Sequence, residues 1–113
     1  MREPERDRGR LEHMVSAIGR VEEYTSGVTK SQLISDPMRL HATVYNVQIV
    51  DEATYKLSKE FKQMHPKTPW RMIEKMRHIL VHGYYQINND ILWDVITGDL
   101  TPLKLQLLEY LAE

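Results

Sequence analysis

The spacing of the apolar residues limits the possible folds of this chain more than any other feature of the sequence. Between Leu11 and Tyr24 the apolar side chains recur at steps of three and four residues, and similar spacing returns in the later segments. Strict alternation of apolar and polar residues, which marks a half-buried β-strand, does not continue over a useful length anywhere. We therefore predict an all-α fold, an antiparallel bundle of about five helices with short connections.

Proline, glycine and capping residues predict where these helices begin and end. Ser26-Gly27 ends the first helix, and a capping box formed by Thr29 and Gln32 opens a short second one. The other expected helices run from Asp36-Pro37 to Pro66, from Thr68-Pro69 to Gly83, over 91–96 up to the break at Gly98-Asp99, and from Thr101-Pro102 to Leu111. In the long helix we expect a buried stripe of Leu40, Val44, Val47, Val50, Leu57, Phe61 and Met64.

Length and composition exclude several classes of protein. The chain has 113 residues, so we expect one domain over 1–113, with residues 1–5 frayed. It contains no cysteine, which excludes disulfides and thiol catalysis. We find no signal peptide and no apolar run of membrane-spanning length, and we expect a soluble cytoplasmic protein that makes no contact with a membrane.

Charge is unevenly distributed along the chain, although the net charge is only −1. The segment from Lys59 to Arg77 has six basic and two acidic side chains, a balance of +4, whereas residues 86–113 have one basic and five acidic ones, a balance of −4. The basic segment could form a local anion site. The alternative, which charge alone favours, is that two solvated helix faces attract one another across the bundle.

The stretch from Arg77 to Tyr85 concentrates the side chains that can move protons or bind phosphate. Arg77 falls within an apolar arc of the expected helix, where an unpaired guanidinium would be costly. Three explanations are open. It pairs with a carboxylate such as Asp51, Glu52 or Asp94, it extends to the surface, or the arc faces a partner chain and a cleft in which Arg77 binds an anion.

The two histidines of this stretch also have competing interpretations. His82 precedes Gly83 at a predicted helix end, where it could serve as a general acid or base or simply cap the helix. His78 and His82 have the spacing of metal ligands, but no third ligand is evident, so we predict no metal site. Arg77 and His82 lie about 140° apart around an ideal helix, which does not place them on one face.

The order Arg77, four residues, His82, one residue, Tyr84 resembles the R-x4-H-x-Y motif of the HepT-like branch of the HEPN domains. Further similar segments extend the resemblance over nearly the whole chain: 20–25, 46–50, Pro69-Trp70-Arg71, Leu80–Tyr84, Trp93-Asp94 and Asp99-Leu100 with Pro102-Leu103. The sequence departs from this family at three positions: it has His78 where asparagine is usual, Asp51 where glycine is common, and Tyr45 where a basic residue is common.

The resemblance implies a helical homodimer that acts as a ribonuclease toxin, with two copies of the motif meeting in a cleft and with neither a metal ion nor a cofactor. It implies that Arg77 binds the scissile phosphate, that His82 activates the ribose 2′-hydroxyl or orients the phosphate, and that His78 supports them. It also implies a nucleotidyltransferase antitoxin of the MNT type, which transfers AMP to Tyr84. The alternative function is a non-catalytic helical interaction module that binds the nucleotidyltransferase partner.

Overall fold

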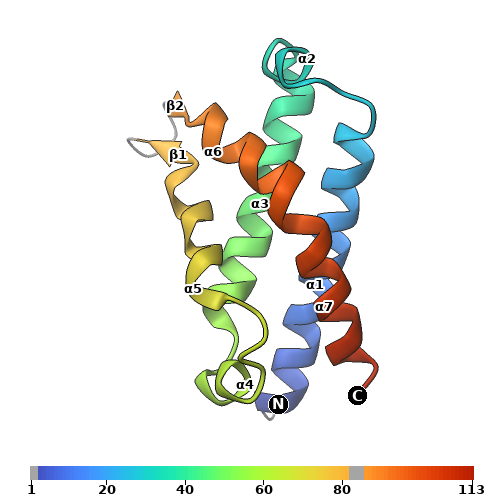
Figure 1. Ribbon diagram of the computed structural model, residues 1–113, viewed down its shortest axis with the longest axis vertical. Helices are drawn as coiled ribbons and strands as arrows, with labels where there is room; N and C mark the ends of the chain where they lie inside the picture. Colours follow the sequence, from blue (N-terminus) through green and yellow to red (C-terminus); the bar gives the residue numbers. More distant parts are fainter. Residues whose placement is uncertain (1–2, 82–85) are drawn as a thin grey trace.

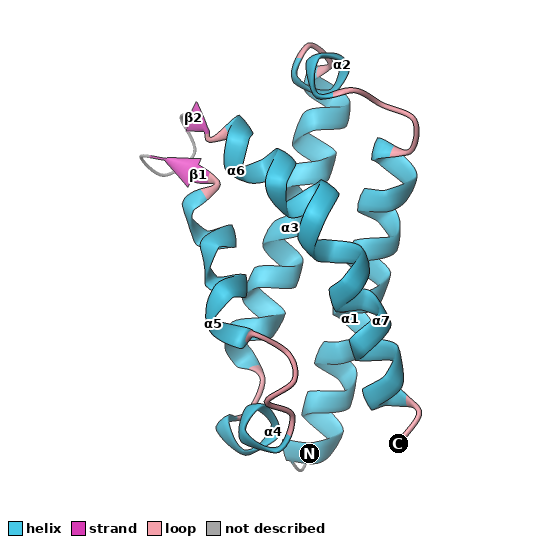
Figure 2. Ribbon diagram, viewed as in Figure 1, coloured by secondary structure: helices cyan, strands magenta, loops and turns pink. Residues whose placement is uncertain are grey.

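The computed structural model describes residues 3–81 and 86–113 and has the predicted all-α bundle fold (Figure 1). Helix α1 runs along the molecule, α3 returns beside it in the opposite direction, and α7 lies in front of α1. The elements are α1 (Glu3–Thr25), α2 (Lys30–Ile34), α3 (Pro37–Lys56), α4 (Lys59–Met64), α5 (Trp70–Ile73), the 3-10 helix η1 (Glu74–His78), β1 (Leu80–Val81), β2 (Gln86–Ile87), α6 (Asn89–Asp94), the π-helical segment η2 (Val95–Asp99) and α7 (Leu100–Leu111). Figure 2 shows that the described strands form only a small hairpin at one edge of the bundle.

The core lies where α1, α3, η1 and α7 meet. Its largest fully buried side chains come from all parts of the chain: Met14, Ile18, Leu33, Met76, Ile79, Leu92, Leu100 and Leu107. The predicted buried faces of the first helix and of the long helix up to Leu57 are confirmed. No helix in the described part of the chain has both the length and the apolarity needed to cross a membrane.

Local capping chemistry places the helix starts near the top of Figure 1 as predicted. Thr29 and Gln32 form the reciprocal capping box, since the Thr29 hydroxyl accepts from the Gln32 N–H at 3.1 Å and the Thr29 N–H donates to the Gln32 side chain at 2.9 Å. Asp36 caps α3 and Pro37 occupies its first turn. Helix α1 already begins at Glu3, so residues 3–5 of the segment expected to fray are helical here.

The expected continuous helix from Pro37 to Pro66 is wrong, because it breaks at Leu57 and restarts as α4. The Ser58 hydroxyl caps α4 by accepting from the Phe61 N–H at 3.1 Å. The Asp7 carboxylate of α1, only 4% exposed, accepts from the Ser58 N–H at 2.8 Å and from its hydroxyl at 2.6 Å. This contact turns the chain, and Met64, predicted to be buried, is therefore 76% exposed.

The expected helix from Thr68 to Gly83 is also wrong. Instead, the chain forms the short helix α5, then the 3-10 helix η1, and then the strand β1. Strand β1 pairs antiparallel with β2, with Leu80 opposite Ile87 and Val81 opposite Gln86. The Asn88 N–H donates to the Ile79 carbonyl at 2.6 Å and closes this hairpin. The Thr68 hydroxyl contacts Gln106 and Tyr110 of α7. Residues 82–85, which include the predicted Gly83 helix stop, lie outside the described residues.

Gly98-Asp99 does not separate two helices, contrary to prediction. The residues 95–99 instead adopt π-helical geometry and join α6 to α7 without a break. Pro102 has no N–H to donate to the carbonyl of Gly98, four residues earlier, and this favours the wider turn. Leu100 is consequently buried in the same helical segment. Leu105 and Leu108, predicted to belong to the apolar pattern of the last helix, are 57% and 44% exposed.

Candidate functional site on η1 and α3

Arg77 stands at the surface of the bundle, and two side chains of α3 hold it. Its Nε lies 3.5 Å from Oδ1 of Asp51, and its Cζ lies 4.9 Å from the ring centroid of Tyr55. Asp51 and Tyr55 are four residues apart, which places them on one face of α3. The Arg77 side chain remains 41% exposed. Of the three explanations for this arginine, the structure shows the pairing with Asp51, and the guanidinium also reaches solvent.

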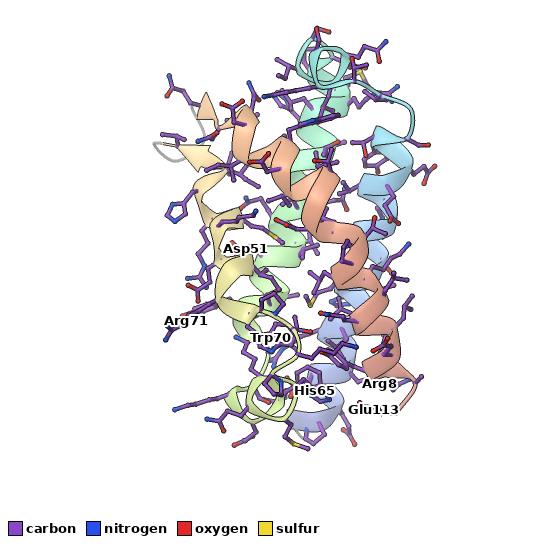
Figure 3. All side chains as sticks on the ribbon, in the orientation of Figure 1. Arg8, Asp51, His65, Trp70, Arg71 and Glu113 are labelled. Carbon is purple, nitrogen blue, oxygen red and sulfur yellow. The ribbon has the colours of Figure 1, made fainter. Side chains whose placement is uncertain are left out.

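Asp51 is the less exposed member of this pair, at 16% for its side chain. Figure 3 places it where α3 passes the α5–η1 segment. Burial raises the pKa of Asp51, and the nearby carboxylates of Glu74 and Glu52 raise it further, while the charge and hydrogen bond of Arg77 act in the opposite direction. The net effect is a raised pKa, so the Asp51 carboxylate is costly to keep charged and depends on Arg77 for compensation.

Lys62 of α4 is a second basic residue, and the charge of Arg77 acts on it. Burial lowers the pKa of Lys62, and the positive charge of Arg77 lowers it further, whereas the Glu74 and Asp7 carboxylates partly oppose this. Among the described residues, no carboxylate lies within ion-pairing distance of the Lys62 amino group. Two cationic groups from separate elements therefore influence the same region of the surface.

Lys67 and Lys75, two of the six basic residues counted in the segment, together with His65, support the alternative interpretation of its charge. Three ion pairs join it to the acidic end of the chain: Lys75 with Asp99 at 2.6 Å, Lys67 with Glu109 at 3.3 Å, and His65 with Glu113 at 3.0 Å. Attraction across the bundle thus accounts for these side chains. It does not account for Arg77, whose recorded carboxylate partner is on α3.

The structure describes some of the predicted site residues but not others. His78 is exposed at the end of η1, and no hydrogen bond from it is found within the described residues. The predicted catalytic His82 and the predicted AMP acceptor Tyr84 lie outside the described residues, so their convergence on Arg77 stays a prediction. Sequence reasoning missed Tyr55 and Lys62; the only signal for Tyr55 was its four-residue spacing from Asp51.

A hollow between α1, α4 and the end of α7 is the main competing location for a site. Its volume is ≈ 410 Å³, and its lining includes Asp7, His65 and Tyr110. Its polar groups are already engaged: Asp7 accepts from Ser58, and both ring nitrogens of His65 have partners, the Phe61 carbonyl at 2.9 Å and Glu113 at 3.0 Å. In Figure 3, His65 and Trp70 lie together at this end of the bundle, away from Asp51. These polar groups of the hollow are therefore already paired, which makes it a weaker candidate than the surface around Arg77.

Metal binding has no support from the described side chains. Over residues 3–81 and 86–113, no group of three or more histidine, aspartate or glutamate side chains is arranged to hold a metal ion. The prediction that the site uses no metal is untested by this observation, since His82 is not among these residues.

Comparison with known proteins gives consistent results across most of the chain. The family model described as "Ribonuclease HepT-like" matches residues 14–110. A protein of Caldanaerobacter subterraneus subsp. tengcongensis named "Putative RNase" is 34% identical over 91% of this chain and 92% of its own length. "Probable ribonuclease HepT" of Thermococcus cleftensis is 31% identical over 83% of this chain and 86% of its own. No solved structure gives a significant match. With its helical bundle, its exposed Arg77 and a family match over residues 14–110, the chain belongs to the HepT-like ribonuclease family.

Proposed function

We propose that this protein is an endoribonuclease toxin that cleaves RNA without a metal ion or cofactor, using Arg77 and His82 as its catalytic residues. The observation that carries the proposal is the exposed guanidinium of Arg77, the first residue of the R-x4-H-x-Y motif. This guanidinium pairs with Asp51 and still reaches solvent, so an RNA phosphate can approach it. The family and the names of the two relatives support RNA as the substrate.

The proposed chemistry is an attack of the ribose 2′-oxygen on the adjacent phosphorus. His82 takes the 2′-hydroxyl proton as the P–O bond forms, and the 5′-oxygen leaves with a proton from a second acid or from water. Arg77 stabilises the negative charge that develops on the phosphate oxygens. His78 supports the geometry as an exposed polar neighbour. The products are a 2′,3′-cyclic phosphate and a 5′-hydroxyl.

The active form we propose is a homodimer in which two copies of the motif line one cleft. Its support is the exposure of two tyrosines on α3, Tyr45 at 67% and Tyr55 at 68%, the second of which contacts Arg77. Exposed aromatic side chains are enriched at interaction surfaces. Light scattering after gel filtration should give a dimer for the wild type and a monomer for Tyr45→Glu. A monomeric wild-type protein that cleaves RNA would contradict the shared cleft.

The partner we propose is an MNT-type nucleotidyltransferase antitoxin that adenylylates Tyr84. An AMP group there would place bulk and negative charge next to the cleft and oppose an anionic substrate. After co-expression with the candidate partner, intact-mass measurement should show the added AMP, and Tyr84→Phe should abolish it. An unmodified Tyr84 peptide throughout would contradict this mode of neutralisation.

The deciding experiment compares the wild type with Arg77→Ala and His82→Ala on RNA in the presence of EDTA. We expect cyclic-phosphate fragments from the wild type alone and growth inhibition on overexpression of the wild type alone. Arg71→Ala is the matched control, since Arg71 is an exposed arginine on the preceding helix that points away from α3 in Figure 3. Equal inactivity of all four proteins would refute the nuclease proposal and leave an interaction module.

A further inference from the structure

We propose that Asp51 and Tyr55 are positioning residues for RNA cleavage, forming a clamp that fixes the Arg77 guanidinium while leaving donors free for a phosphate. This inference rests on the proposed function and adds two residues to the site. Neither would touch the reacting atoms. Both act through Arg77, one through a charged contact at its Nε and the other through an aromatic ring under its plane.

The geometry divides the guanidinium into a held edge and a free edge. Its shortest contact with Asp51 is made through Nε, at 3.5 Å. A carboxylate on that side can engage at most two of the five N–H donors, so at least three remain. The side chain as a whole is 41% exposed, which leaves room for a ligand to approach it. A planar group with one edge anchored and the other open is suited to bidentate contact with phosphate oxygens.

Tyr55 restricts the motion that Asp51 alone would permit. A single ion pair lets a long side chain rotate about the contact, and exposed pairs of this kind hold geometry poorly. The ring centroid of Tyr55, 4.9 Å from the Arg77 Cζ, adds a cation–π contact from the same face of α3. Because Tyr55 is itself 68% exposed, burial alone gives no reason for its position against Arg77.

The two contacts explain why a half-buried carboxylate beside a phosphate site is compatible with RNA cleavage. Asp51 repels the substrate, so its loss should not weaken binding. It orders the group that must meet the transition state, so its loss should slow the chemical step. A misplacement of about 1 Å in a catalytic group can lower rates by on the order of 100-fold. A competing role, in which Asp51 merely occupies Arg77 and inhibits it, predicts the opposite change in rate.

The chain supplies a matched control for Asp51. Glu52 neighbours Asp51 in the sequence and pairs with Lys56 at 2.8 Å, so Glu52→Gln removes a nearby charge without touching the clamp. Each variant is kept only if gel filtration and thermal unfolding match the wild type.

The test measures kcat and KM on a defined RNA oligonucleotide, and affinity for the same oligonucleotide with a 2′-O-methyl group at the cleavage site. We expect Asp51→Asn to lower kcat by about 10- to 100-fold, with affinity unchanged or tighter. Tyr55→Leu should lower kcat several-fold, Tyr55→Phe should restore it, and Glu52→Gln should match the wild type. An unchanged or higher kcat for Asp51→Asn would overturn the clamp.

A readout that does not require cleavage separates failure of the clamp from failure of the nuclease proposal. In nitrogen-15 NMR, the Arg77 Nε–Hε group should be rigid and slow to exchange in the wild type, and mobile in Asp51→Asn and Tyr55→Leu. Rigid Arg77 without any cleavage by the wild type would refute the nuclease proposal alone. Mobile Arg77 in the wild type would refute the clamp whatever the activity.

Discussion

The contact between Asp7 and Ser58 is the clearest case in which a single buried group decides the path of the chain. Asp7 on α1 holds the N-terminus of α4, 51 residues away, through hydrogen bonds of 2.8 and 2.6 Å. We predict that Asp7→Ala destabilises the fold by about 3 kcal/mol. Hydrogen bonds to a charged group contribute about 1.5–3 kcal/mol each, and we take the lower value because half-buried Ser58 can regain water.

The size of the effect can be measured by thermal unfolding. With an unfolding entropy of about 2.1 cal/mol/K per residue, 3 kcal/mol in a chain of 113 residues lowers Tm by about 13 °C. Asp7→Asn keeps the shape and one acceptor oxygen and should cost about half as much. The control is Glu12→Ala on the same helix, because Glu12 is exposed and pairs with Arg8 at 3.5 Å, and its loss should stay within about 0.5 kcal/mol.

A double-mutant cycle with Ser58→Ala isolates the contact itself. The hydroxyl hydrogen bond to Asp7 is lost in either single variant, so the two costs should not add, and we expect a coupling energy of about 1–1.5 kcal/mol. Additive costs, or a loss below about 1 kcal/mol for Asp7→Ala, would show that the break between α3 and α4 has another cause.

Three further predictions concern charge, backbone conformation and pH. Lys62→Gln should weaken binding of 2′-O-methylated RNA about threefold to tenfold, whereas exposed Lys59→Gln on the same helix should not, as measured by fluorescence anisotropy. Gly27 has a φ of 70°, so Gly27→Ala should lower the free energy of unfolding by about 1 kcal/mol. Gly19 lies in the middle of a helix, and an added Cβ there would have nothing within 4 Å, so Gly19→Ala should raise the free energy of unfolding in urea by about 0.5–1 kcal/mol. The pKa of His65 is raised, so the contribution of this residue to the stability of the fold should be complete below about pH 6.5 and should decline as the pH rises through the raised pKa. The variant His65→Phe should lose this pH dependence.

The sign of the His65 prediction follows from its surroundings. Burial alone would lower the pKa of this imidazole, but hydrogen bonds to Glu113 and to the Phe61 carbonyl, and the charge of Glu113, outweigh burial. Both ring nitrogens face acceptors, and only the protonated ring can donate to both. The ring also packs between Phe61 and Tyr110, with centroids 4.1 and 4.3 Å away. Stability that rose with pH in the wild type alone would contradict this account.

Features that depend on neighbours in the sequence could be predicted. The capping box at Thr29, the Asp36 cap and the buried faces of α1 and α3 each follow from side chains within a few residues of one another. The chain turn at Ser58 could not be predicted in this way. Ser58 looks like an ordinary residue of a helical pattern until Asp7, 51 residues earlier, accepts from its N–H.

The segment around the motif has a spacing that fits two kinds of helix. Ile73, Met76 and Ile79 are spaced by three residues each time, and all three are buried in the structure. A period of three aligns side chains on one face of a 3-10 helix, whereas an α-helix has steps of four as well. The step of four from Met76 to Leu80 fits an α-helix, so the sequence alone did not decide between them.

The candidate site was only partly predictable for a similar reason. Asp51 could be named as a partner for Arg77 because a carboxylate was required and few were available in the facing helix. Tyr55 and Lys62 could not be identified, since a ring under a guanidinium and a cation on α4 depend on how three elements pack.

The net charge of −1 does not exclude RNA binding, because the basic side chains are held in different ways. Lys67 and Lys75 pair with acidic residues of α7 and η2, whereas Arg77 pairs with Asp51 but stays 41% exposed, and Lys62 has no ion pair among the described residues. Two phosphate contacts per protomer predict a slope of log K against log salt of about −1.4 for single-stranded RNA, or about −2.8 if one strand spans both protomers. Anisotropy titrations with 2′-O-methylated RNA from low to high salt would measure it. A slope steeper than about −4 would mean that a wider basic surface binds the RNA, and that the site on η1 and α3 is not the principal contact.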